Sequence, residues 1–202
     1  MVEPIDKRAD HAGVSARVQR SKDAVLATTF ELMSEAGIGG VSVDEVSRRS
    51  GVAKTTIYRH WPSRSALLLD ACSRLRPPLD PPNTGSLKGD LTVLVGFLAR
   101  QLNEARWPTI LPSIVDAAER DPEIAVLHAR LQAGFAAPYL AVIEQAKKRG
   151  ELAAQQRAAD VVAAIYGPFF YRRWYSREPI DKSFVNGVVK AVLAGLKAPE
   201  AP

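Results

Sequence analysis

The sequence feature that most constrains the fold is a short segment from Ser42 onward that is marked out by capping and turn residues. Ser42 and Glu45 have the spacing of a capping box, in which the serine oxygen accepts the glutamate backbone N–H and the glutamate side chain reaches back. This pattern predicts a helix over about 43–50. Gly51 predicts its end, because glycine readily adopts the left-handed conformation that closes a helix.

A second short helix is predicted from Lys54 to Trp61, because Pro62 cannot continue it. Ser63 has the position of an N-cap for the next helix. The apolar residues of that helix recur at helical spacing and are Ala66, Leu67, Leu68, Ala71 and Leu75. Two short helices around a tight glycine turn, followed by a third helix, have the pattern of a helix-turn-helix.

A helix is also predicted before this segment. From Ser21 to Met33, apolar residues recur at helical spacing, and Gly37 predicts the stop. Residues 1–17 lack this periodicity and contain Pro4 and Gly13, so we expect them to form a flexible arm. The predicted N-terminal domain, with three helices leading into a fourth, therefore spans 18–76.

A proline-rich connection over 77–85 separates this domain from a C-terminal region, 86–198, because proline cannot continue a helix. Apolar periodicity of the helical kind returns there, and we find no hairpin pattern. The predicted helices are 86–104, 108–119, 122–149, 158–175 and 181–197. We therefore expect an all-α protein with an N-terminal helix-turn-helix domain and a C-terminal helical domain.

The composition is that of an ordinary globular protein, with 47% hydrophobic and 24% charged residues. No segment approaches the roughly 20 uninterrupted apolar residues of a membrane span. A single cysteine, Cys72, excludes a disulfide within the chain and fits a reducing compartment. We expect a cytoplasmic protein without a membrane partner, in which Cys72 is a buried structural thiol.

Positive charge is concentrated where the helix-turn-helix is predicted. The net charge is only +5, but the segment between Glu45 and Asp70 contains basic residues and no acidic ones, namely Arg48, Arg49, Lys54, Arg59 and Arg64. A helix-turn-helix places its second helix in the major groove of DNA, so the partner predicted here is double-stranded DNA.

We assign roles within this segment from side-chain chemistry. Thr55 and Thr56 are predicted to read base edges, because threonine offers a hydroxyl group and a methyl group that can meet thymine. Lys54, Tyr58 and His60 are predicted to contact phosphates, which fixes register without reading sequence. The full set of predicted DNA-binding residues is Ser42, Arg48, Lys54, Thr55, Thr56, Tyr58, Arg59, His60 and Arg64.

The run from Gly51 to Leu67, GVAKTTIYRHWPSRSAL, resembles the signature of TetR-family repressors. The resemblance covers residues 20–72, with Ala53 where a capping serine is frequent and Trp61 where phenylalanine is commoner. It implies a homodimer that reads a near-palindromic operator and a C-terminal domain that dimerises and binds an inducer. It also implies DNA contacts by Thr55, Thr56, Tyr58 and His60, and places Arg64 where lysine is common.

The C-terminal region contains the residues that we predict to bind a small apolar or amphipathic effector, namely Trp107, Leu111, Phe135, Tyr139, Tyr166 and Phe170. The predicted dimer interface consists of Phe169, Trp174, Phe184, Val188 and Val192. Aromatic residues at helical spacing serve a core or an interface as readily as a pocket, and both roles stay open here. The alternative to a ligand-released repressor is a constitutive or protein-responsive DNA-binding regulator without a pocket.

Enzymatic function is not expected. The sequence has no phosphate-binding glycine loop, nucleophile elbow or paired-carboxylate pattern. The histidines His11, His60 and His128 are dispersed and have no cysteine or carboxylate at ligand spacing, so neither a metal site nor a cofactor is predicted.

Overall fold

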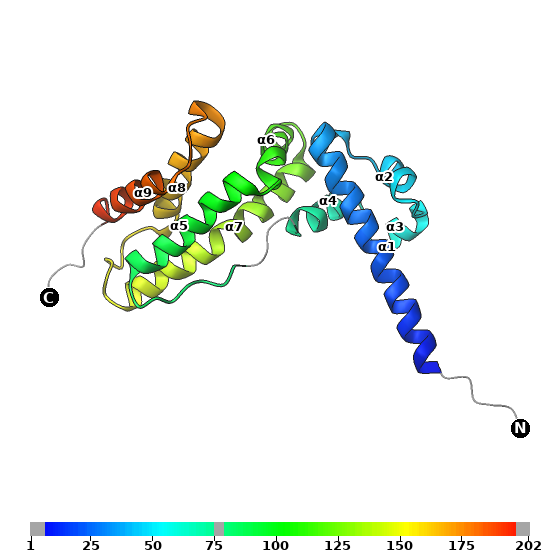
Figure 1. Ribbon diagram of the computed structural model, residues 1–202, viewed down its shortest axis with the longest axis horizontal. Helices are drawn as coiled ribbons and strands as arrows, with labels where there is room; N and C mark the ends of the chain where they lie inside the picture. The colour runs from blue at the N-terminus through cyan, green and yellow to red at the C-terminus, as the bar shows by residue number, and fades with distance from the viewer. Residues whose placement is uncertain (1–6, 75–78, 197–202) are drawn as a thin grey trace, which may run out of the picture. The chain divides into compact units, whose positions relative to one another are not determined.

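The structure, a computed structural model, describes residues 7–74 and 79–196, with side chains from residue 16 onward. Every regular element in those ranges is helical, as the all-α prediction requires (Figure 1). The chain divides into two compact units. Within the described ranges, unit 1 comprises 7–74 and Thr109–Leu131, and unit 2 comprises the remaining residues.

Unit 1 contains the predicted helix-turn-helix. Its elements are α1 (Lys7–Ala36), the 3-10 turn η1 (Ile38–Gly40), α2 (Val43–Ser50), α3 (Lys54–His60), α4 (Arg64–Ser73), most of α6 (Trp107–Ala118) and the first turns of α7 (Pro122–Lys148). Helix α1 packs against α2 and α4, and α2 packs against α3 (Figure 1). The bounds of α2 and α3 agree with the sequence prediction to within one residue.

Helix α1 is longer than predicted. It begins at Lys7, so residues 7–17, which we expected in a flexible arm, are helical. Gly13 lies inside this helix, and one glycine costs only about 1 kcal/mol relative to alanine, too little to end a helix on its own. The remainder of the predicted arm, residues 1–6 with Pro4, lies outside the described residues.

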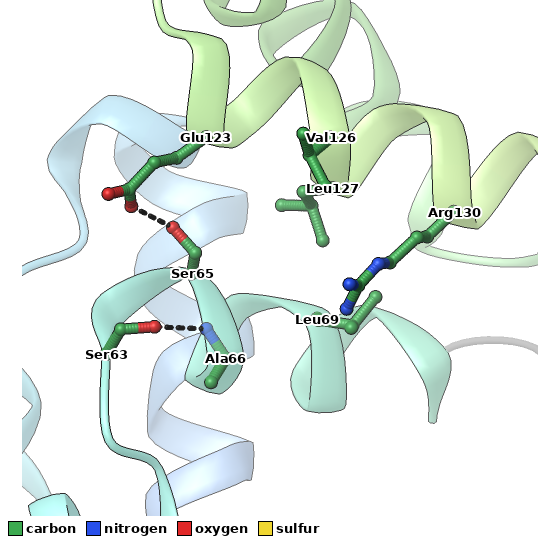
Figure 2. A pocket seen from close by; sticks show the side chains of 8 residues that line it. All are labelled: Ser63, Ser65, Ala66, Leu69, Glu123, Val126, Leu127 and Arg130. Carbon is green, nitrogen blue, oxygen red and sulfur yellow. Dashed lines mark hydrogen bonds between the residues drawn. The ribbon is translucent and has the colours of Figure 1, made fainter.

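The grouping of residues 109–131 with the N-terminal helices differs from the domains expected from sequence. The Oγ of Ser113 on α6 accepts a hydrogen bond from the backbone N of Ile38 at 3.1 Å. On α7, a carboxylate oxygen of Glu123 accepts a hydrogen bond from Ser65 Oγ at 2.6 Å (Figure 2). Side chains separated by many residues in sequence therefore bind these segments to unit 1. Residues 75–78, 197 and 198 of the expected segments, Leu75 among them, lie outside the described residues.

Unit 2 consists of α5 (Leu87–Glu104), the rest of α7, α8 (Ala158–Phe170), the π-helical turn η2 (Tyr171–Ser176) and α9 (Lys182–Ala194). Helix α5 packs along α9, and α8 also contacts α9. Within the described ranges α7 alone is long and apolar enough, by length and composition, to cross a bilayer. Its side chains Tyr139, Val142 and Ile143 are fully buried in the protein.

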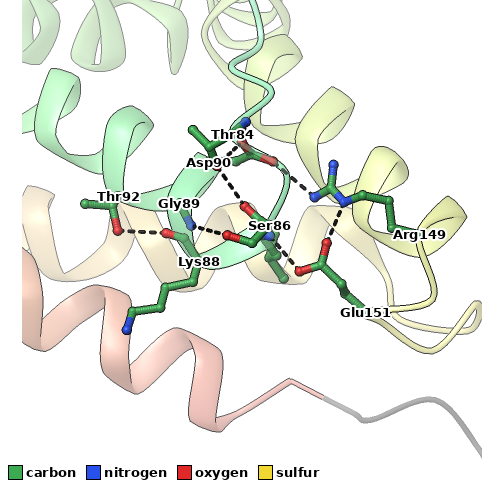
Figure 3. A network of polar contacts seen from close by, with 9 residues as sticks. Thr84, Ser86, Lys88, Gly89, Asp90, Thr92, Arg149 and Glu151 are labelled. Carbon is green, nitrogen blue, oxygen red and sulfur yellow. Dashed lines mark hydrogen bonds and ion pairs between the residues drawn. The ribbon is translucent and has the colours of Figure 1, made fainter.

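A buried carboxylate, that of Asp90, connects the segment before α5 to the segment after α7. Asp90 has no exposed surface, and its carboxylate accepts hydrogen bonds from the N and Oγ1 of Thr84 at 2.6 and 2.8 Å. The guanidinium of Arg149 contacts Asp90 at 3.1 Å and Glu151 at 2.5 Å (Figure 3). Glu151 in turn accepts a hydrogen bond from the N of Leu87 at 2.7 Å. This network fixes the start of α5 to the residues that follow α7.

Burial raises the pKa of Asp90, but the hydrogen bonds from Thr84 and the guanidinium of Arg149 outweigh it, so the pKa lies below its ordinary value. A carboxyl group whose pKa is lower in the folded state stabilises the fold above its unfolded pKa, about 4. This stabilisation is lost as the pH falls through the lower, folded-state pKa.

We predict that Asp90→Asn lowers the free energy of unfolding at neutral pH by roughly 1.5–3 kcal/mol, the range for hydrogen bonds to a charged group. Urea unfolding at neutral and acid pH measures this, and the difference from the wild type should shrink in acid. Asp160→Asn is the control, because that carboxylate is 60% exposed and lies 3.8 Å from its partner Arg157. Equal losses in both variants would contradict the assigned role of Asp90.

Candidate nucleic-acid interface

The candidate interface is the outer face of α3. Ile57 is fully buried and anchors the helix, whereas Thr55, Tyr58 and Arg59 are exposed. These three residues have the i, i+3, i+4 spacing that places side chains on one face of a helix. Tyr58 is 49% exposed despite its size. Thr56, the other predicted base reader, is half-buried.

The turn between α2 and α3 is held by local hydrogen bonds. Gly51 adopts the left-handed conformation predicted for it, with φ of 71°, and its N donates to the carbonyl of Ser47. The Oγ of Ser47 donates to the carbonyl of Val52 at 2.8 Å, a contact that sequence reasoning missed. At the start of α3, Ala53 provides no side-chain cap.

One of the two hydrogen bonds expected for the capping box at α2 is present. Ser42 Oγ accepts a hydrogen bond from the N of Glu45 at 3.1 Å. The carboxylate of Glu45 instead binds Arg48 at 2.6 Å and Arg49 at 2.7 Å. Hydrogen bonds from these two guanidinium groups lower the pKa of Glu45 to about 2. Glu45 therefore remains ionised and offsets the charge of α2.

Pairing with acids changes the electrostatics expected from the basic segment. Lys54 lies 2.6 Å from Asp44, a residue just before the segment that we counted as free of acids. Arg49 also binds Glu35 of α1 at 2.7 Å. Arg59, by contrast, forms no ion pair within the described residues. The exposed face of α3 is thus less cationic than the sequence suggests, with Arg59 as its unpaired charge.

His60 is half-buried and is the last residue of α3. Desolvation lowers its pKa, and the positive charges of Lys22 and Arg59 lower it further. The imidazole is therefore neutral at neutral pH and can offer an N–H group to a phosphate. Lys22 belongs to α1 and was not among the predicted site residues. Its signal in the sequence was its place at the end of the basic group Arg17, Arg20 and Lys22, at the start of the first predicted helix.

Trp61 connects the end of α3 to α4. Its indole is 6% exposed, and Nε1 donates to a carboxylate oxygen of Asp70 at 2.9 Å. Its ring also contacts His60 edge to face, with centroids 5.8 Å apart. A tryptophan at this position therefore does more than enlarge the apolar contact of a phenylalanine, because it adds a hydrogen bond to α4.

Arg64 has a structural role that the sequence analysis missed. Its Nε donates to the carbonyl of Val41 at 2.7 Å, and its Nη2 donates to the carbonyl of Ile38. The half-buried guanidinium thus joins the start of α4 to the connection between η1 and α2. The geometry shows a clamp that positions α2, and the DNA contact that the sequence predicts at Arg64 stays a prediction.

The predicted effector residues are Trp107, Leu111, Phe135, Tyr139, Tyr166 and Phe170. Leu111 belongs to unit 1, and the others belong to unit 2. In unit 2 the structure brings the aromatic rings together, with centroid distances of 5.3 to 5.5 Å. The hydroxyls of Tyr139 and Tyr166 donate to the carbonyls of Leu94 and Phe135 at 3.0 and 3.1 Å. These rings therefore pack on one another.

The residues predicted at the dimer interface are largely inside unit 2. Phe169, Val188 and Val192 are at most 8% exposed, and Phe169 packs on Phe184 with a centroid distance of 5.0 Å. These three side chains are core residues and are not available at the surface of the protomer. Trp174 and Phe184 are half-buried.

Cys72 is buried, and burial raises the pKa of its thiol to about 12. The thiol is therefore protonated and unreactive at neutral pH. Among the side chains that the structure describes, no group of three or more His, Cys, Asp and Glu is arranged to hold a metal ion.

Comparison with protein families identifies the class of the chain. A family described as bacterial regulatory proteins, tetR family, matches residues 25–71, and a family described as tetracyclin repressor-like, C-terminal domain, matches residues 81–192. Together the two matches cover most of the chain, so this protein belongs to the TetR family. It is a helix-turn-helix transcriptional regulator; proteins of this family bind DNA, act as dimers and are not enzymes.

Individual relatives align over nearly the full chain. YdeS, an HTH-type transcriptional regulator of Bacillus subtilis, is 28% identical and the alignment covers 92% of this chain and 94% of YdeS. The DNA-binding transcriptional repressor TetR of Mycobacteroides abscessus is also 28% identical, with coverage of 92% and 98%. The crystal structure of the TetR-family regulator SCO0332 matches with a TM-score of 0.69 at 27% identity, covering 88% of this chain and 98% of that one.

We predict that Arg64→Lys lowers the free energy of unfolding by roughly 1–2 kcal/mol even though the charge is kept. Lysine lacks the rigid fork that reaches two carbonyls at once, and a part-buried carbonyl that loses its donor is costly. Urea unfolding measures the effect. Arg59→Lys is the matched control, since Arg59 is exposed and forms no ion pair within the described residues. Equal stability of the two variants would show that Arg64 is not a clamp.

Proposed function

We propose that this regulator is a cytoplasmic repressor that binds a palindromic operator as a homodimer and is released by a small-molecule effector. The observation that carries the proposal is the exposed face of α3, where the side chains of Thr55, Tyr58 and Arg59 lie at the surface and do not belong to the core. A large aromatic side chain that remains 49% exposed on a short, well-anchored helix supports a binding role for that surface. The relative in M. abscessus that is named a repressor supports negative regulation.

Each polar residue of α3 is suited to one kind of DNA contact. Thr55 and Thr56 lie in its first turn and read base edges, because recognition helices use their N-terminal residues for that purpose. Tyr58 and Arg59 bind phosphates, with neutral His60 as a further donor. Lys54 and Arg48 reach phosphates by exchanging their present carboxylate partners, and Ser42 contributes its hydroxyl group next to the start of α2.

We propose that the homodimer forms through the exposed faces of α8 and α9. The outward side of α8 has the small residues Ala159, Ala163 and Gly167 at intervals of four, and α9 presents Gly187 and Ala191 in the same way. Small side chains allow two helices to approach closely, and two helices from each protomer form a four-helix bundle. This assignment replaces the buried residues predicted from sequence.

Effector release is proposed as a population shift toward a dimer whose recognition helices no longer match successive major grooves. The alternative, a constitutive regulator, has one observation in its favour. The aromatic cluster predicted to line the effector cavity is packed on itself, and its two tyrosine hydroxyls bind backbone carbonyls. An effector in that place would have to displace buried side chains, so a different pocket deserves a test.

We predict that Tyr58→Ala weakens binding to a generic DNA duplex, whereas Thr55→Ala leaves that binding nearly unchanged. The phosphate contact is independent of sequence, and the base contact matters only at a specific site. Fluorescence anisotropy at several salt concentrations measures both, and the loss of affinity for Tyr58→Ala should be roughly 1 kcal/mol, as for one hydrogen bond.

Selection of bound sequences from random DNA duplexes then separates the residues that read bases from those that contact phosphates. Thr55→Ala and Thr56→Ala should alter the preferred base at one or two positions, whereas Tyr58→Ala should leave the preferred sequence intact. Thr92→Ala is the matched control, because this exposed threonine lies on α5 in unit 2. Unchanged preferences in both α3 threonine variants would remove those residues from base readout.

We predict that Ala163→Arg shifts the protein from dimer to monomer, because a long charged side chain on α8 prevents the close approach of a partner helix. Sedimentation velocity measures the change, and circular dichroism checks that the helices remain. Ala133→Arg, at an exposed alanine of α7, is the control and should stay dimeric. A dimer in both variants would place the interface elsewhere.

A further inference from the structure

Unit 1 contains a pocket that none of the predicted sites uses. It has a volume of about 300 Å³ and lies between α4 and the first turns of α7 (Figure 2). The lining residues are Ser63, Ser65, Ala66, Leu69, Glu123, Val126, Leu127 and Arg130. All of them belong to unit 1.

The α7 wall of this pocket has a polar group at each end and apolar groups between. Glu123, Val126, Leu127 and Arg130 have the i, i+3, i+4, i+7 spacing of one helix face. Seven residues at a rise of 1.5 Å separate the two charged positions by about 10 Å along the axis. The wall therefore presents a carboxylate, an apolar stretch and a guanidinium in sequence.

The two ends differ in the ligand groups that they can accept. At one end Glu123 accepts a hydrogen bond from Ser65 Oγ at 2.6 Å, with Ser63 close by (Figure 2). A carboxylate has acceptor sites beyond the one that Ser65 uses, so this end suits a hydrogen-bond donor. At the other end Arg130 extends from α7 toward Leu69 (Figure 2). Its guanidinium has no hydrogen bond or ion pair within the described residues, so this end suits an anion.

The middle of the pocket offers apolar surface. Leu127 is 2% exposed and forms part of the core, whereas Val126 is 55% exposed. Leu69 is half-buried on the α4 side. An aliphatic chain of a ligand would cover Val126 and Leu69, and burial of apolar surface stabilises the bound state.

We propose that this pocket binds a linear amphipathic molecule that has a carboxylate at one end and an ammonium or hydroxyl group at the other. The carboxylate pairs with Arg130, the donor group binds Glu123, and the aliphatic chain lies on Leu69 and Val126. Charge-assisted hydrogen bonds at both ends give the site its selectivity.

The position of the pocket also gives it a regulatory role, and this part rests on the proposed function. Helix α4 follows α3 after three residues, and Ser63, which lines the pocket, is the N-cap of α4. Trp61 at the end of α3 binds Asp70 of α4. A ligand donor that binds Glu123 beside Ser65 therefore acts next to the start of α4, the helix to which the recognition helix is attached.

Titration of the purified full chain with three probes, followed by NMR, tests the site directly. The probes are ε-aminocaproate, hexanoate and hexylamine, which have both end groups, the carboxylate alone and the ammonium alone. We expect ε-aminocaproate to bind most tightly. Arg130→Gln should weaken both acids by about tenfold or more, as expected for one charge-assisted hydrogen bond, and spare hexylamine. Glu123→Gln should weaken the two amines and spare hexanoate.

Arg120→Gln is the matched control, because this exposed arginine pairs with Asp116 outside the pocket. Its affinities should equal those of the wild type. No binding of any probe to the wild type, or equal affinities in the Arg130 and Arg120 variants, would overturn the proposal. Operator affinity with and without ε-aminocaproate is measured separately. Ligand binding without a change in DNA affinity would retain the site and contradict only its regulatory role.

Discussion

The burial of Ile57, on the inner face of α3, is the interaction on which the rest of unit 1 depends. Helix α3 has seven residues, and isolated helices shorter than about 12–15 residues are marginal in water. It exists because Ile57 and Val46 are fully buried and because Trp61 binds Asp70 of α4. The clamp of Arg64 on two backbone carbonyls positions α2 in the same way. Rigidity from these neighbours, rather than helix propensity, presents Thr55, Tyr58 and Arg59 in a fixed arrangement.

Electrostatic balance sets how this surface can recognise DNA. Carboxylates of Asp44 and Glu45 pair with Lys54 and the arginines of α2. Arg59 and the α1 residues Arg17, Arg20 and Lys22 form no ion pair within the described residues. Non-specific binding depends on such cations and falls steeply with salt. A surface with so much internal neutralisation favours recognition through placed hydrogen bonds over a general attraction to polyanions.

Sequence reasoning predicted the elements of the fold well where local signals decide them. The capping serines, Gly51 and Pro62 act within one turn of the chain, so α2, α3 and the start of α4 were predicted to within a residue. It failed where distant residues decide. The Ser113 and Glu123 contacts that bring 109–131 into unit 1 have no local signature. Similarly, Val188 and Val192 have the spacing of a helix face, but the sequence cannot say whether α5 or a second protomer covers that face. The role of Arg64 and the pocket beside Arg130 likewise depend on tertiary placement.

The central claim is that α3, held by its buried contacts, reads DNA from a symmetric dimer. Selection of bound fragments from random duplex DNA by the purified wild-type protein tests it most directly. We predict an enriched inverted repeat whose half-sites are separated by about 34–36 Å, one helical turn, or a multiple of it. Recovery of no sequence above background from folded protein at low salt, or enrichment of a single asymmetric site, would contradict the account.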